Sequence, residues 1–199
     1  MSVASRIILL LTALVAAYEV VAGIENYSQL TIIYFTLGFG IILLSALLIL
    51  LMGYDILENP VVSVIATVLP VSFALGLVNE YLPDWHTLIF GLTAAGILLM
   101  IILKYSRQSR WSVFILIPLH GLSGLIIFVL PFYLAITGYK NLWFMLVGIG
   151  GLSMGLIGLL LTMLKLGKPV LTKEKILFLF PFILLFSTFL FGLGLNFGM

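Results

Sequence analysis

Residues 111–139, WSVFILIPLHGLSGLIIFVLPFYLAITGY, contain no Asp, Glu, Lys or Arg. A helix needs about 20 mostly apolar residues to cross the roughly 30 Å of bilayer hydrocarbon, so this stretch is long enough to span it. The whole chain of 199 residues resembles it, with 63% hydrophobic and 8% charged residues. Soluble domains carry about a quarter charged residues, so this composition predicts a protein whose solvent is lipid.

The runs are uniformly apolar and do not alternate between apolar and polar residues, as the strands of a membrane barrel would. Helices are the other structure that satisfies every backbone polar group in lipid. The sequence therefore predicts an all-α fold, a polytopic integral membrane bundle of seven helices. Six spans are charge-free and the first contains one acid; they are 7–23, 29–54, 59–79, 85–103, 111–139, 141–164 and 176–199.

The first span has two interpretations. Arg6 precedes its apolar run, and LVAAYEVVAG (14–23) offers small residues for cleavage, as in a signal peptide. We expect the segment to be retained as a membrane helix. Because the connections between spans are short, we also expect 1–199 to form a single domain without a separate extramembrane catalytic loop.

Basic residues indicate the orientation. Eight of the nine fall on one side if the N-terminus is cytoplasmic, and only Lys140 falls on the other. The eight are Arg6, Lys104, Arg107, Arg110, Lys165, Lys168, Lys173 and Lys175. The positive-inside rule then predicts a cytoplasmic N-terminus and an external C-terminus, in a plasma or inner membrane. The tryptophans Trp85, Trp111 and Trp143 lie at predicted helix ends, where aromatic belts form.

Several function classes lack the residues they need. The chain has no cysteine, which removes thiol catalysis, disulfides and thiolate-bound iron–sulfur clusters. No basic tract with interleaved aromatics suggests a nucleic-acid partner. An intramembrane enzyme acting on lipid or quinone would need a nucleophile–base pair or a metal cluster, and no such motif is recognisable. The sequence favours a non-enzymatic role.

Two ionisable residues fall inside predicted spans, where such residues mark functional sites by default. Glu19 lies about twelve residues into its span, or roughly 18 Å, and His120 lies nine residues beyond Trp111, or roughly 13 Å. We expect them near mid-membrane, and they face each other if the first and fifth helices are neighbours. For Glu19 a structural role, as a protonated hydrogen-bonded carboxyl, and a functional role stay open.

His120 has three interpretations. It either packs and bonds a serine or a carbonyl freed by Pro118, or handles protons and ligands with Glu19, or ligates haem or chlorophyll beside Gly121 and Gly124. A haem held by two histidines is excluded within one chain, because His86 lies roughly 15 Å away in depth.

Polar loops and small residues give weaker signals. The stretch NEYLPDWH (79–86), with Glu25 nearby, gathers acids and a histidine without a recognisable metal spacing, so solvated loop polarity is the favoured interpretation. Asp55 and Glu58 are expected to pair with Lys or Arg from another loop on their side. The sixth span is rich in small residues that let helices approach closely, within the chain or toward another subunit. They are Gly148, Gly151, Ser153, Gly155 and Gly158.

Two functions are expected from these features. The first is a non-catalytic integral subunit of a larger energy-converting or transport complex, in contact with lipid and with other membrane subunits or a second copy. The alternative is a small secondary transporter or channel with proline breaks in the third, fifth and seventh helices. Its path would be lined by Glu19, Ser72, Asn79, His120 and Ser123.

Overall fold

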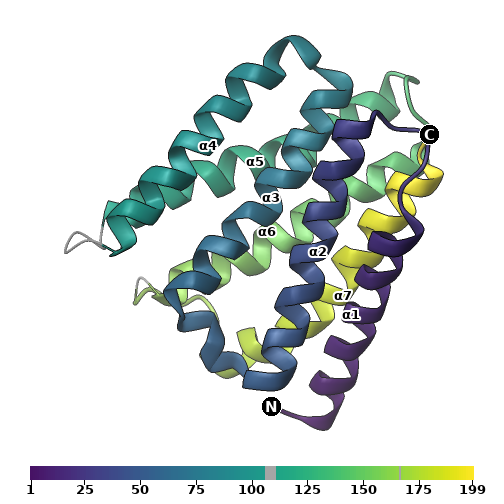
Figure 1. The fold of residues 1–199 in the computed structure, drawn as a ribbon. Coiled ribbons are helices and arrows are strands. Elements are labelled where there is room, and N and C mark those ends of the chain that lie inside the picture. Colours follow the sequence, from purple (N-terminus) through teal and green to yellow (C-terminus); the bar gives the residue numbers. More distant parts are fainter. Residues whose placement is uncertain (106–110, 166) are drawn as a thin grey trace.

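The computed structural model describes residues 1–105, 111–165 and 167–199, which form seven α-helices and two short 3₁₀ helices (Figure 1). In chain order they are α1 (Val3–Ala22), α2 (Gln29–Met52), η1 (Tyr54–Glu58), α3 (Pro60–Tyr81), α4 (Pro83–Tyr105), α5 (Trp111–Ile136), η2 (Leu142–Phe144), α6 (Met145–Lys165) and α7 (Lys173–Phe197). All seven α-helices are long and apolar enough to cross a membrane. The predicted all-α bundle with seven such helices is confirmed.

Local sequence sets several helix boundaries. Asn59 caps α3, because its side-chain oxygen accepts the backbone N–H of Val61 at 2.8 Å, and Pro60 occupies the first turn. Gly23 and Gly53 end α1 and α2 with φ angles of 78° and 77°, a conformation that other residues rarely adopt. Polar capping residues and glycines therefore mark these helix ends in a sequence that is otherwise apolar.

The expected proline breaks are not there. Pro70 lies inside α3, Pro118 and Pro131 inside α5, and Pro181 inside α7, and each of these helices continues through its proline. Proline is tolerated within membrane helices because neighbouring groups satisfy the backbone carbonyl that it frees. The chain therefore lacks, among its described residues, the interrupted helices typical of many transporters.

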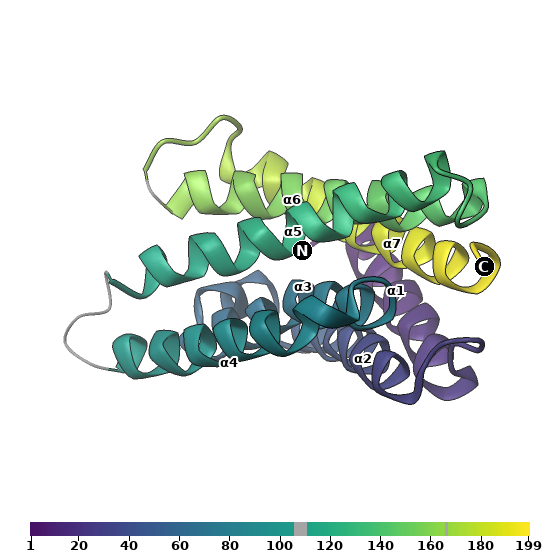
Figure 2. The ribbon, with the colours of Figure 1, turned by 90° about the horizontal axis from the view of Figure 1, so that it is seen from above.

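Six helices form a closed ring in the order α1, α2, α3, α5, α6, α7, with α7 returning to α1. α4 lies outside the ring and packs against α3 and α5, at the edge of the bundle in Figures 1 and 2. We call the end of the bundle where α1 begins the N-terminal end, and the end where α7 finishes the C-terminal end. Consecutive helices alternate in direction between these two ends (Figure 1).

Aromatic side chains fill the space between α2, α3 and α7. Phe35, Phe39 and Phe73 are completely buried and Phe191 nearly so. The Phe73 and Phe191 rings stack with centroids 4.5 Å apart, and Phe39 meets Phe73 edge-on at 5.3 Å. The stack joins α3 to α7 across the ring, so packed side chains fill the ring interior at this level.

Glycines make room for these rings. A Cβ on Gly38 of α2 would lie 2.6 Å from the Phe73 ring, and one on Gly76 of α3 would lie 2.5 Å from the Phe35 ring. Each helix therefore offers a glycine to the other helix's phenylalanine. In lipid, where burial brings little hydrophobic gain, such close van der Waals contact drives helix association.

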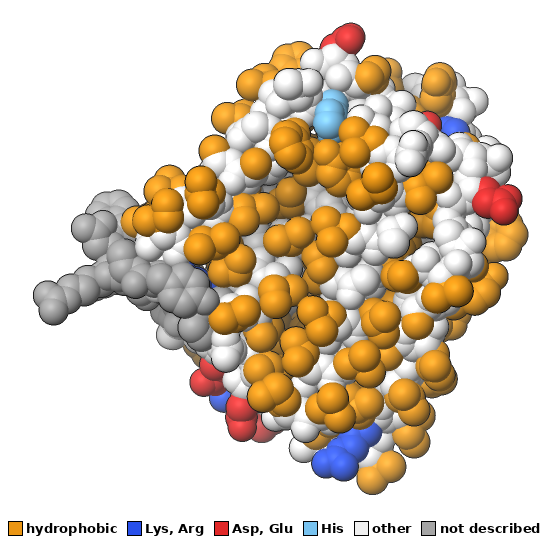
Figure 3. Space-filling model, in the orientation of Figure 1, with side chains coloured by type: hydrophobic (Ala, Val, Ile, Leu, Met, Phe, Trp, Pro, Cys, Tyr) orange, Lys and Arg blue, Asp and Glu red, His pale blue; other side chains and the backbone are white. Residues whose placement is uncertain are grey.

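Apolar and charged side chains occupy different parts of the surface along the helix axes. Hydrophobic side chains cover the lateral face shown in Figure 3, and charged side chains gather at its two ends. This distribution matches a molecule whose sides face hydrocarbon and whose ends face water.

We predict that Gly38→Ala destabilises the bundle by about 1–3 kcal/mol, because the added methyl group overlaps the Phe73 ring. Gly40→Ala, one half-turn away on α2, is the matched control, since a Cβ at that position would meet nothing within 4 Å. It should leave stability unchanged or raise it by about 0.5–1 kcal/mol. Thermal unfolding in a mild detergent measures both, and equal midpoints would refute the interlocking of Gly38 with Phe73.

Candidate functional site

The side chain of Glu19 lies between α1 and α7 and is 6% exposed. Asn196 of α7 donates from Nδ2 to Glu19 Oε2 at 3.0 Å and to the Gly192 carbonyl at 2.9 Å. This pair joins residues that are 177 positions apart in the sequence, near the ends of the first and last helices. It supplies the buried carboxyl with one donor.

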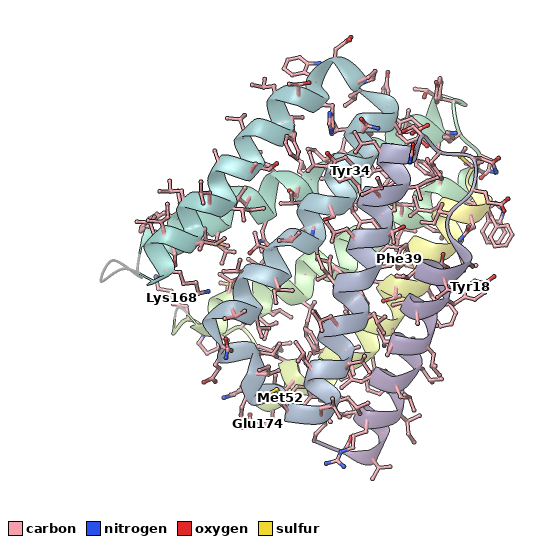
Figure 4. The ribbon with its side chains drawn as sticks, viewed as in Figure 1. Tyr18, Tyr34, Phe39, Met52, Lys168 and Glu174 are labelled. Atoms are coloured by element: carbon pink, nitrogen blue, oxygen red, sulfur yellow. The ribbon has the colours of Figure 1, made fainter. Side chains whose placement is uncertain are left out.

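Gly192 provides the space that the carboxyl occupies. A Cβ at this position would overlap Glu19 Oε1, so the absence of a side chain lets the carboxyl press against the α7 backbone. A pocket of about 570 Å³ reaches the same carboxyl from outside the ring. Leu14 and Tyr18 of α1 and Phe189, Leu193 and Phe197 of α7 contribute to its lining. Tyr18 projects away from the bundle at the open side of this pocket (Figure 4).

No cation of the described chain pairs with Glu19. An exposed ion pair at the N-terminal end joins Lys173 to Glu58 at 3.2 Å. Lys140, the basic residue at the C-terminal end, lies over the Tyr81 ring at 5.4 Å and contacts Met199 Sδ at 3.2 Å. Glu19 is therefore a buried carboxyl held by an amide rather than by an opposite charge.

Glu19 and His120 lie at different heights along the bundle. Because α1 begins at Val3 and ends at Ala22, Glu19 lies three residues, or roughly 5 Å, from the C-terminal end of that helix. His120 lies sixteen residues before the end of α5 at Ile136, or roughly 24 Å from the same side. α1 packs against α2 and α7, whereas α5 packs against α3, α4 and α6. The structure does not bring the two residues together.

His120 is half-buried on α5, and its buried Nδ1 makes no hydrogen bond within the described residues. A Cβ on Gly121 or Gly124 would meet nothing within 4 Å. The other histidine, His86, contacts Tyr34 Oη through Nε2 at 2.9 Å near the start of α4.

The remaining polar candidates lie apart from Glu19. Asn79 donates to Ser28 Oγ at 3.0 Å and to Thr31 Oγ1 at 2.9 Å, which ties the α1–α2 connection to α3. Ser72 is buried and donates to the carbonyl of Val68 on its own helix at 2.8 Å. Ser123 is buried on α5. These side chains do not line the Glu19 pocket.

The small residues of α6 divide into two groups. A Cβ on Gly148 would meet the Phe132 ring at 2.7 Å, and one on Gly151 would overlap Ile127, so both fit α6 closely against α5. One and two turns further along α6, a Cβ on Gly155 or Gly158 would meet nothing within 4 Å. Ser153 is half-buried and donates to the Ile149 carbonyl at 2.9 Å.

Two of the loop acids, Glu58 and Glu80, have partners on other segments. Glu58 pairs with Lys173, as expected for an acid beside a basic loop, and such an exposed pair adds about 1 kcal/mol at most. Glu80 Oε2 accepts the backbone N–H of Ser28 at 3.1 Å. The His, Asp and Glu residues of the described ranges form no group that would hold a metal ion. Arg107 and Arg110 of the predicted basic side lie outside the described residues.

Sequence reasoning missed two members of the site, Asn196 and Gly192. The available signal is an asparagine one turn after a glycine within the apolar final span, a polar residue that needs a partner in lipid. Its partner is on the first helix, and apolar periodicity does not reveal which helices are neighbours.

We predict that Asn196→Leu lowers the free energy of unfolding by about 0.6–2 kcal/mol, because Glu19 loses its amide donor. In a Glu19→Leu background the same change should cost less, since no buried carboxyl is left unpaired. Asn141→Leu is the control, because Asn141 donates to the Phe197 and Met199 carbonyls instead. Its cost should not depend on Glu19→Leu. Equal costs of Asn196→Leu in both backgrounds, measured by detergent unfolding, would contradict the coupling.

A carboxyl in this setting can exchange a proton, accept hydrogen bonds or bind a cation that enters from the side. Comparison with known proteins adds no relative: no family model, curated protein or solved structure matches this chain.

Proposed function

We propose that the chain is a non-catalytic integral membrane subunit, packed against transmembrane helices of other subunits in a larger energy-converting or transport complex. Two features indicate that the function is carried by the outer surface of the bundle. Phenylalanine side chains fill the ring between α2, α3 and α7. The described connections are short, and the longest of them include the 3₁₀ turns η1 and η2.

The observation that carries this proposal is the division of the α6 glycines. Gly148 and Gly151 meet α5 closely, whereas Gly155 is exposed and Gly158 is open beyond its own helix. Small residues one turn apart give another helix close backbone approach, a contact that lipid chains do not supply. Gly121 and Gly124 on the neighbouring helix α5 are open in the same way. The occupant that suits this surface is a transmembrane helix of another subunit.

The proposed orientation places the N-terminus in the cytoplasm of a plasma or inner membrane, with the C-terminus outside. It is supported by the basic residues that lie in or next to the terminal turns of helices at the N-terminal end of the bundle. Those described are Arg6, Lys104, Lys165, Lys168, Lys173 and Lys175. Lysine and arginine are retained on the cytoplasmic side of membrane proteins.

A small secondary transporter is the second candidate, and the Glu19 pocket favours it. A path shared by Glu19 and His120 lacks support, because their helices are not neighbours. Transport would therefore use the side of the bundle between α1 and α7, where the acid and Asn196 meet.

We predict that Gly155→Leu and Gly158→Leu reduce the recovery of partner polypeptides with the protein after gentle detergent extraction from native membranes. Both substitutions enter open space, so the chain should still fold, but a bulky side chain keeps a partner helix away. Gly91→Leu on α4 is the matched control, also exposed and also open within the chain. It should leave recovery unchanged.

The absorbance spectrum of the same preparation tests His120. A stoichiometric visible chromophore lost in His120→Ala would support haem or chlorophyll ligation within the complex. A second copy of this chain as the sole partner would make the assembly a homo-oligomer. A colourless protein that purifies alone as a monomer would contradict the subunit proposal and favour transport.

A further inference from the structure

We infer that the pocket between α1 and α7 is a binding site for a lipophilic organic cation, with Glu19 as the anionic partner of its charge. The pocket is a different surface from the open α6 glycines, so cation binding here does not depend on the subunit proposal. The carboxyl, its surroundings and the route by which a ligand reaches it each point to such a ligand.

The carboxyl lacks a cation. Burial of an ionised carboxylate is costly unless an opposite charge accompanies it, and the Asn196 amide supplies only one hydrogen bond. At the C-terminal end of the bundle, the basic residue Lys140 is engaged with Tyr81 and Met199. A cationic ligand would supply the positive charge that no Lys or Arg of the described residues provides to Glu19.

The walls of the pocket suit the rest of such a ligand. Leu14, Leu193 and three aromatic residues, Tyr18, Phe189 and Phe197, surround the approach to the carboxyl. Aromatic faces attract cations electrostatically, and more strongly where water is excluded. Aliphatic and aromatic walls with one charged group at the base are typical of sites that bind apolar molecules through a single polar end.

The pocket is reached from the side of the bundle. Tyr18, Phe189 and Phe197 are 67%, 47% and 60% exposed, on a lateral surface that is otherwise hydrophobic. The lining also includes Gly23, in the connection after α1, so the pocket extends from the side of the bundle toward its C-terminal end. An organic cation with apolar substituents partitions into lipid and meets the carboxyl directly, and a volume of about 570 Å³ accommodates several rings or part of a chain.

The test is equilibrium binding of tetraphenylphosphonium to the purified full chain in a neutral detergent. Tetraphenylborate, of the same shape and opposite charge, is the control ligand. We expect saturable binding of the cation and none of the anion. Glu19→Gln keeps an oxygen for the Asn196 donor, removes the charge and should weaken binding at least about tenfold. Glu25→Gln, on the exposed connection six residues later, should bind as the wild type does.

A second variant covers the case in which Glu19→Gln fails to fold. Tyr18→Ala, at an exposed position of the pocket, should weaken binding about threefold through loss of an aromatic face. Tyr133→Ala is its matched control, because Tyr133 is 61% exposed on α5, away from the pocket. Unchanged affinity in folded Glu19→Gln, unchanged affinity in Tyr18→Ala, or equal binding of tetraphenylborate would each overturn the site, as would absence of cation binding to the wild type.

The cation can come from two sources, the ammonium headgroup of a lipid or a free molecule. Binding is therefore repeated in nanodiscs of equal phosphatidylglycerol content, completed either with phosphatidylethanolamine or with an uncharged glycolipid. Weaker binding in the ethanolamine discs would assign the lipid headgroup as the resident ligand. Equal binding would assign a free lipophilic cation, and either result keeps the site. Loss of partner recovery in the Gly155 and Gly158 variants is measured separately, so failure of one proposal is distinguishable from failure of the other.

Discussion

An apolar side chain gains little hydrophobic free energy when it moves from lipid into a contact between helices, because both surroundings are apolar. The association of helices in lipid therefore depends on close van der Waals contact between complementary shapes. In this chain that contact is made between glycines and bulky side chains. Gly38 receives Phe73, and Gly76 receives Phe35, which binds α2 to α3. A Cβ on Gly150 would lie 3.1 Å from the Phe191 ring, so this glycine holds α6 close to α7. The aromatic stack and the ring of helices around it both depend on these approaches.

Polar contacts add to this packing mainly at the C-terminal end of the bundle. Tyr27 Oη donates to the Leu195 carbonyl at 3.1 Å, where burial raises the pKa of the phenol above its ordinary value. Asn141 donates to the Phe197 carbonyl at 2.6 Å, and Asn196 holds Glu19. The first two bonds satisfy carbonyls in the last turn of α7, which lack partners along their own helix, and the third joins the side chain of Asn196 to α1. The final helix is thereby fixed to the first helix and to two connections.

Toward the N-terminal end of the bundle, α5 and α6 are packed less closely. On α5 and α6 the glycines nearer the N-terminal end, Gly121, Gly124, Gly155 and Gly158, leave open space, although Gly148 and Gly151 on the same α6 helix are filled. The two proposals follow from this arrangement. Open small-residue surface suits another helix, whereas the buried carboxyl on the other side of the ring suits a cation that arrives through lipid.

Composition and run length by themselves determined that the chain forms seven apolar helices and roughly where each lies, because hydrocarbon permits few backbone structures and fixes their length. They also placed the basic residues toward one end and marked Glu19 as a residue to explain. Only the tertiary structure decided which helices are neighbours. Uniformly apolar helices carry little periodicity to orient them, so the sequence did not separate Glu19 from His120 or reveal Asn196 as the partner of Glu19. The same limit applied to the α6 glycines, since their spacing is alike and only the presence or absence of packed atoms where each Cβ would lie distinguishes filled from open positions.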